Sequence, residues 1–231
     1  MRPIDRRATP RDGSDEPKGF SKYRHARKDL IDRLGQYCSY CGTRLPASLA
    51  VEHVRPKKPN PDLELRWDNF LLACTNCNST KGDKDVVLDE YFWPDKDNTF
   101  RAFVYTEGGL IEVNSDLTDD ERELAQSTID LVGLDRTPAN DPAVADRRWK
   151  NRDEVWTMAI DARQDLAAQG TETLRKWIVN TATGRGFWSV WMTVFADDQN
   201  MRKRLIDAFP GTSKDCFDDE CRPVRRPGRA L

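Results

Sequence analysis

The sequence lacks any long hydrophobic run: nothing in its 231 residues approaches the roughly 18 to 20 consecutive apolar residues that a membrane-spanning helix needs. The N-terminal residues 1–7 are charged and no apolar stretch follows them, so no secretory signal is expected. We therefore expect a cytoplasmic protein with no membrane partner, in a compartment where thiols stay reduced. In that setting the six cysteines indicate metal ligands or buried thiols before they indicate disulfides.

Charge is nearly balanced, with 37 Lys+Arg against 39 Asp+Glu, but it is unevenly distributed along the chain. Residues 1–85 carry 17 basic and 12 acidic side chains, a net charge of +5, whereas residues 86–231 carry 20 and 27, a net charge of −7. The basic part is where a nucleic acid is expected to bind. The acidic part is better suited to solubility or to contact with a protein partner.

Four of the cysteines form two C-x2-C pairs, Cys38 with Cys41 and Cys74 with Cys77. Two such pairs supply the four thiolates of a closed tetrahedral zinc site of the structural kind. The segment 38–81 is short and rich in Pro, Lys and Asn, so metal binding is expected to supply folding energy that packing lacks. Cys216 and Cys221 form the remaining pair. Because the sequence has no further cysteine pair to complete a second zinc site, we expect these two residues to be ordinary thiols.

The pattern of apolar residues predicts short strands over 49–54 and 69–73, separated by a proline-rich loop, and a short helix over 78–83. A helix is expected over 20–34, and a hairpin over 100–114 turns at Glu107-Gly108-Gly109. Thr118 and Glu121 match a capping box that opens a helix ending near residue 131. Further helices are predicted over 143–168, 171–180 and 187–209.

Three motifs lie within or beside the zinc-stapled unit: Val51-Glu52-His53-Val54, Trp67-Asp68-Asn69-Phe70 and residues 77–82. Their order closely resembles the HNH endonucleases of the ββα-metal fold, with Asn78 standing where that family usually has its third motif residue, a His. The resemblance and the patterns above predict an α+β fold: a zinc-stapled ββα-metal HNH core with an added β-hairpin and a mainly α-helical C-terminal region. The expected segments are an extended arm (1–19), the HNH core (20–95), the hairpin (96–116), the helical region (117–215) and a flexible tail (216–231).

Hydrolysis of a phosphodiester needs an activated water, and a neutral imidazole with a pKa of about 6.5 is suited to take its proton, so His53 is the expected general base. By resemblance, Glu52 and Asn78 bind a catalytic Mg²⁺ or Mn²⁺, and Asn69 is a catalytic residue that braces the loop and helps to hold the base. Since Glu52 and His53 are neighbours on a strand, we expect a bend there. Phosphate contacts are expected from the basic residues closest to the site in sequence: Lys57, Lys58, Lys81 and Lys84.

Simpler interpretations stay open for these residues. His53 can be a structural histidine, and Asn69 and Asn78 can be turn or cap residues. His25, the second of only two histidines, has no partner motif and indicates surface or packing. The whole unit can also be a zinc-ribbon module that binds nucleic acid or protein without cutting it.

The layout resembles a narrower family as well. Arg2-Pro-Ile-Asp-Arg6, the motifs within 51–82 and Thr128-Ile-Asp-Leu-Val-Gly-Leu-Asp135 are similar to the HNH nuclease subunit of the Septu anti-phage system, also found beside some retrons. That resemblance implies an effector of antiviral defence whose nuclease activity is inhibited by an ABC/SMC-like ATPase partner until infection. It leaves DNA and tRNA open as substrates, and DNA is the favoured one.

Overall fold

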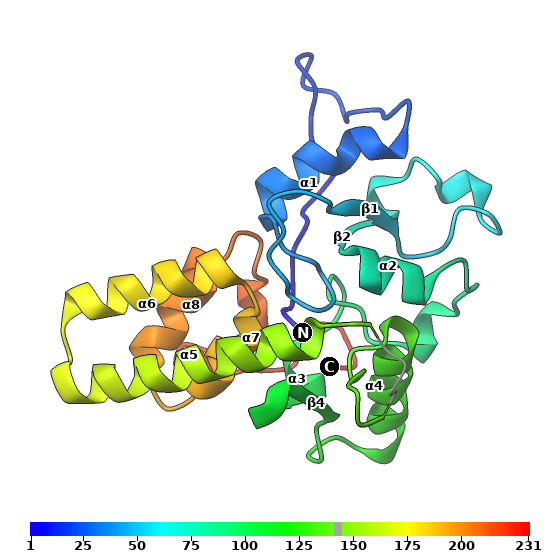
Figure 1. Ribbon diagram of the computed structural model, residues 1–231. Helices are drawn as coiled ribbons and strands as arrows, with labels where there is room; N and C mark the ends of the chain where they lie inside the picture. Colours follow the sequence, from blue (N-terminus) through cyan, green and yellow to red (C-terminus); the bar gives the residue numbers. More distant parts are fainter. Residues whose placement is uncertain (141–144) are drawn as a thin grey trace.

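Two small antiparallel sheets and a set of helices make up the parts of the chain that the computed structural model describes, residues 1–140 and 145–231 (Figure 1). The mixed composition, with helices dominating after residue 117, confirms the predicted α+β class. In chain order the elements are η1 (Tyr23–Ala26), α1 (Arg27–Leu34), β1 (Ala50–His53), η2 (Pro61–Leu63), η3 (Trp67–Asn69), β2 (Phe70–Ala73), α2 (Thr75–Lys81), η4 (Leu88–Glu90), α3 (Thr99–Ala102), β3 (Phe103–Thr106), η5 (Glu107–Gly109), β4 (Leu110–Val113), α4 (Asp119–Val132), α5 (Arg148–Gln169), α6 (Glu172–Arg185), α7 (Trp188–Val194), α8 (Gln199–Ala208) and η6 (Lys214–Cys216).

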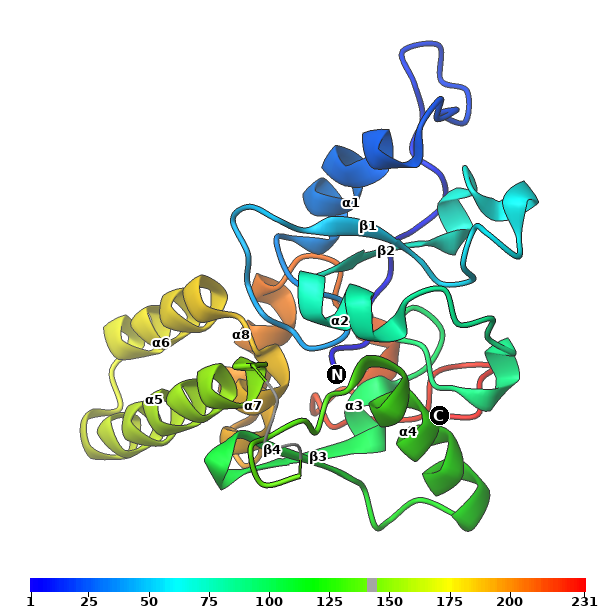
Figure 2. The same ribbon diagram turned by 45° about the vertical axis from the view of Figure 1, so that its right-hand side comes forward.

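The first sheet pairs β1 with β2 in a regular register, from Ala50 opposite Ala73 to His53 opposite Phe70. All four residues of β2 are buried, since α1 packs against this strand. Helix α2 follows β2 directly and packs against β1, which gives the ββα arrangement expected from the sequence (Figure 2). It starts at Thr75, earlier than predicted, because the Cys74 sulfur accepts a hydrogen bond from the Cys77 amide and caps the helix.

The second sheet is the predicted hairpin of β3 and β4, with Thr106 opposite Leu110. Its first strand begins at Phe103, later than predicted, because the Asn98 side chain accepts a hydrogen bond from the Phe100 amide and caps α3. Its turn needs glycine for a steric reason at Gly109, where φ is +68° and an added Cβ would lie 2.0 Å from the carbonyl oxygen of Trp149 on α5. The hairpin therefore packs directly onto the start of α5.

The helical region follows the predictions with corrections at three boundaries. The capping box of Thr118 and Glu121 is present and opens α4. Helix α5 begins at Arg148, and the predicted start at residue 143 lies outside the described residues. Helix α6 continues to Arg185, and the single helix predicted over 187–209 is two helices, because the Asp198 side chain caps α8 by accepting a hydrogen bond from the Met201 amide. In both views α5 and α6 form an antiparallel pair that projects away from β1, β2 and α2 (Figures 1 and 2).

Both ends of the chain pack near the centre of the molecule (Figure 1). Residues 1–19 form no helix, and within them Ile4 is buried and its amide donates to the Pro94 carbonyl at 2.7 Å. The prediction of a flexible tail over 216–231 is wrong for the structure described here. Leu231 is buried and its carbonyl accepts from the Asn98 amide at 2.9 Å, while the Asn98 side chain donates to the carbonyls of Cys216 and Val224.

Candidate functional site

The four cysteines of the two C-x2-C pairs meet at one point between the loop before β1 and the start of α2. Their sulfur atoms all lie within 4.8 Å of one another, and the Cys41 and Cys74 sulfurs are 3.7 Å apart. Four sulfurs at about 2.3 Å from a tetrahedral zinc ion would be separated by about 3.8 Å, so the cluster fits that metal. All four side chains are buried, which is typical of a structural site. The cysteine cluster expected from the spacing is thus present.

An arginine from the helical region contacts one of these sulfurs. The Arg148 guanidinium lies 2.9 Å from the Cys77 sulfur and is held by Asp146, which in turn accepts a hydrogen bond from Asn76 on α2. Four thiolates around Zn²⁺ carry a net negative charge, and a buried guanidinium offsets part of it. No local sequence pattern indicated Arg148, because it lies 71 residues from Cys77.

His53 is the last residue of β1, and its imidazole is held in one orientation. Its Nε2 lies 2.9 Å from the Glu64 carbonyl oxygen, and its ring packs edge-on against Tyr23 and Phe70 with centroid distances of 4.9 and 5.3 Å. A carbonyl oxygen only accepts hydrogen bonds, so Nε2 carries the hydrogen and Nδ1 carries the lone pair. Burial, with a smaller effect of the Lys57 charge, lowers the pKa of His53 below its usual value, although the Glu64 carbonyl opposes the shift. The ring is therefore neutral near pH 7.

Glu52 contacts α2, whereas the neighbouring His53 contacts η1 and the loop after β1. The Glu52 carboxylate is buried, and its Oε1 lies 2.9 Å from the Lys81 ammonium, although no donor reaches that oxygen with good hydrogen-bond geometry. Burial raises the pKa of Glu52, and the Lys81 charge opposes that shift. The bend expected at these residues is absent from the strand itself, whose pairing is one-to-one through His53; the chain bends at Val54 and Arg55, directly after it.

Asn78 lies on α2 one turn before Lys81, on the helix that packs against β1. It is half-buried, and its side-chain amide makes no hydrogen bond to any residue within 1–140 or 145–231. A free amide oxygen and a buried carboxylate oxygen without a hydrogen-bond donor are the oxygen ligands that a hard cation such as Mg²⁺ prefers. Glu52 on β1 and Asn78 on α2 lie on elements in contact and offer oxygen atoms of the kind that such an ion binds, and the Glu52 Oε1 is paired with Lys81.

Asn69 holds the loop that follows β1. Its Oδ1 accepts from the Arg55 amide at 2.8 Å, and its Nδ2 donates to the carbonyls of Arg55 and Leu63 at 2.9 and 3.2 Å. These bonds engage both ends of a buried amide. The geometry therefore favours the bracing role over direct contact with a substrate.

The lysines expected to contact phosphates divide into two groups. Lys57, Lys58 and Lys84 are exposed. The prediction for Lys81 is corrected, because its ammonium is 1% exposed, pairs with Glu52 and donates to the His53 carbonyl at 2.8 Å. Lys81 holds the strand and the helix together and does not reach the surface.

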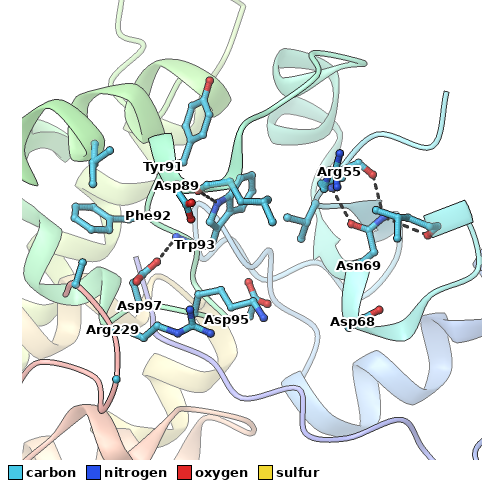
Figure 3. Close-up of a pocket in the computed structure, with 17 residues that line it drawn as sticks. Arg55, Asp68, Asn69, Asp89, Tyr91, Phe92, Trp93, Asp95, Asp97 and Arg229 are labelled. Atoms are coloured by element: carbon cyan, nitrogen blue, oxygen red, sulfur yellow. Dashed lines mark hydrogen bonds between the residues drawn. The ribbon is translucent and has the colours of Figure 1, made fainter. Parts of the chain in front are cut away.

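A cavity of about 630 Å³ is lined in part by the loop that Asn69 braces (Figure 3). Arg55, Asn69, Asp97 and Arg229 are among the residues that line it, and His53, Glu52 and Asn78 are not. Burial raises the pKa of Asp97 to about 6, although its carboxylate accepts a hydrogen bond from the Trp93 amide at 2.8 Å. The cavity thus shares Asn69 with the candidate site but not Glu52, His53 or Asn78, and the sequence patterns did not indicate it.

The last two cysteines lie outside the cluster, as expected. Cys216 is buried, Cys221 is half-buried, and both are free thiols. Burial raises the pKa of Cys216 to about 11, so this thiol stays protonated and inert.

Comparison with known proteins agrees with this geometry. Residues 38–84 match the model of the HNH endonuclease family, and this segment contains the four clustered cysteines together with Glu52, His53, Asn69 and Asn78. Over 82 residues the chain is 33% identical to the Septu protein PtuB of Bacillus thuringiensis, which covers 33% of this chain and 32% of that protein. The match thus spans about a third of the length of that relative. The resemblance to HNH endonucleases and to a Septu protein, expected from the motifs, is confirmed. None of the helices in the described residues is long and apolar enough to cross a membrane.

Proposed function

We propose that the chain is a metal-dependent HNH endonuclease that hydrolyses phosphodiester bonds of nucleic acid, with DNA as its favoured substrate. The observation that carries the proposal is the orientation of His53. Its Nε2 is bound to the Glu64 carbonyl, so the Nδ1 lone pair is free to accept a proton. A zinc-ribbon module that only binds does not require a neutral imidazole held in this orientation.

In this proposal Glu52 and Asn78 hold a Mg²⁺ or Mn²⁺ ion, which, when bound, supplies positive charge to the scissile phosphate. His53 Nδ1 takes a proton from the attacking water while the water oxygen bonds to phosphorus. The P–O bond to the leaving oxygen breaks, and the leaving oxygen keeps the electron pair of that bond. The Glu64 carbonyl stabilises the imidazolium through Nε2. Lys81 opposes the effect of burial on Glu52 and so favours the ionised carboxylate that a cation needs. Asn69 keeps the loop that carries Arg55 and Leu63 in place.

Cleavage of plasmid DNA, linear DNA and tRNA with Mg²⁺ or Mn²⁺ tests this proposal. The chain offers a matched control, because its second histidine, His25, is exposed and its imidazole hydrogen-bonds only to Ser21 within the described residues. His53→Ala should abolish cleavage, and His25→Ala should retain it. Equal cleavage by the wild type and His53→Ala would remove His53 as the base. Binding without cleavage under every metal condition would favour the zinc-ribbon module, and cleavage of tRNA alone would replace DNA as the substrate.

We further propose that the enzyme is an effector of an anti-phage defence complex and that an ABC/SMC-like ATPase regulates it. The similarity to a Septu protein supports this role, and the net negative charge of residues 86–231 suits contact with a protein partner. Co-expression with an ATPase of this ABC/SMC-like class should yield a complex in which nuclease activity depends on the ATPase. A monomer with full activity, indifferent to the ATPase, would contradict the regulatory part and leave the nuclease proposal intact.

A further inference from the structure

A run of positive charge lies beside the candidate site but outside the segment that matches the HNH family. Residues 22–28, which cover η1 and the start of α1, contain no acidic residue. Lys22, Arg24, Arg27 and Lys28 are all exposed. We call these four residues the N-terminal basic track.

The track is connected to His53 through Tyr23. The Tyr23 ring packs against the His53 imidazole at 4.9 Å, and η1 packs against β1. On the same ring the Lys57 ammonium lies 4.5 Å from the centroid. Tyr23 therefore contacts both the proposed base and a lysine of the loop after β1, and it places the track near both.

Much of this charge has no acidic partner. Within the described ranges, Lys22, Arg24, Arg27 and Lys58 form no ion pair, whereas Lys28 pairs with Asp32. Tyr23 and Glu64 both line a hollow of about 220 Å³, in which Glu64 is the one acidic lining residue. Lys57 pairs with Glu64 at 3.5 Å and so compensates its negative charge. Exposed cations that lack neighbouring anions repel one another and attract a polyanion.

We propose that the N-terminal basic track binds the phosphodiester backbone of the nucleic acid on the His53 side of the site. This inference rests on the proposed function, since it names a surface that delivers the substrate to that site. Phosphate contacts of this kind fix the position of a polymer without reading its sequence. The contribution of the track should therefore appear as affinity and as salt dependence.

The test is a binding titration of the full chain by fluorescence anisotropy, without added Mg²⁺ or Mn²⁺, using duplex DNA, single-stranded DNA and RNA of equal length. Arg24→Glu/Arg27→Glu reverses two charges of the track. Arg163→Glu/Lys176→Glu reverses two exposed charges near the tip of α5 and α6, which projects away from β1 (Figure 1). The track variant should weaken binding at least about tenfold and reduce the slope of log K against log salt by about 2, as expected for two lost phosphate contacts. The control should keep the affinity and slope of the wild type, and Arg24→Lys/Arg27→Lys should keep most of the affinity because it keeps the charge.

Equal affinity and slope for the wild type and the track variant would overturn the inference, with folding checked by thermal melting and zinc content. The inference would also be overturned if the wild type bound none of the three polymers. The polymer that binds most tightly in a track-dependent way identifies the backbone that is recognised. If binding depends on the track but the chain never cleaves, the inference is supported and the proposed function is refuted. If the chain cleaves but its affinity does not depend on the track, the proposed function is supported and the inference is refuted.

Discussion

Lys81 and Glu52 form a buried ion pair in which the ammonium nitrogen lies 2.9 Å from the carboxylate oxygen Oε1. The same ammonium donates to the His53 carbonyl at 2.8 Å, so one side chain of α2 holds two successive residues of β1. Each partner compensates the charge of the other in a place that water does not reach. Because Glu52 is a proposed metal ligand and His53 the proposed base, the pair fixes the geometry of the candidate site as well as the packing of α2 on β1.

Replacement of Lys81 by methionine should lower the free energy of unfolding by about 3–5 kcal/mol, because Glu52 would remain buried without a counter-charge. Lys84→Met, at an exposed position on the same segment, should change it by less than about 0.5 kcal/mol. Urea unfolding followed by circular dichroism measures both. Adding Glu52→Gln to Lys81→Met should recover part of the loss, since the remaining amide is neutral; strictly additive effects would show that the pair is not coupled.

Serine at Cys77 should abolish tight zinc binding and destabilise residues 38–84, because the four-sulfur cluster joins the loop before β1 to the start of α2. The wild type should contain about one zinc ion per chain by elemental analysis. Cys221→Ser, at a half-buried cysteine outside the cluster, should retain the zinc and the unfolding transition of the wild type. Full zinc content in Cys77→Ser would exclude this cluster as the zinc site.

Local patterns predicted those parts of the site whose partners are close in sequence or repeat a spacing. The C-x2-C pairs, the β1–β2 pairing and the β3–β4 hairpin all follow from spacing, turn residues and alternation. The remaining contacts join residues that no local rule connects. The Glu64 carbonyl, in the proline-rich loop after β1, accepts a hydrogen bond from the His53 imidazole. The Arg148 guanidinium contacts the Cys77 sulfur, although the two residues are 71 positions apart in the sequence.

The two clearest errors have a common physical cause. Lys81, in a polar segment after Cys77, and the Pro- and Arg-rich tail have compositions typical of solvent-exposed chain. In the structure a buried carboxylate pairs with Lys81, and the Asn98 side chain binds carbonyls of Cys216 and Val224 more than 100 residues away. Burial of polar groups depends on such distant partners, so composition alone could not indicate it.

Asp97 should make the stability of the protein depend on pH. Its pKa in the folded chain is about 6, above the ordinary 3.8, so the folded state binds the proton more tightly than the unfolded state does. The favourable contribution of the protonated carboxyl is complete below about pH 3.8 and is lost as the pH rises through about 6. Asp97→Asn keeps an acceptor for the Trp93 amide and should be more stable than the wild type at pH 7, by up to about 3 kcal/mol, with the advantage vanishing near pH 4.

Thermal and urea unfolding from acid to neutral pH measure that difference. Asp89→Asn, at an exposed aspartate lining the same cavity, controls for the loss of one negative charge. A stability difference between Asp97→Asn and the wild type that stays constant with pH would show that Asp97 does not titrate in this range.

The pH dependence of cleavage should report the environment of His53. Burial and the Lys57 charge lower its pKa below 6.5, so the neutral imidazole, which is the form that can act as a base, persists below that pH. The value of kcat/KM should therefore be level near pH 7 and fall only below about 6.5. Lys57→Ala removes one cause of the lowered pKa and should move this acid limb to higher pH. Lys58→Ala removes an equal charge from an exposed neighbour that makes no cation–π contact with Tyr23 within the described residues, and should move the limb less. An acid limb above 6.5, or equal shifts in the two variants, would mean that a group other than His53 controls the rate.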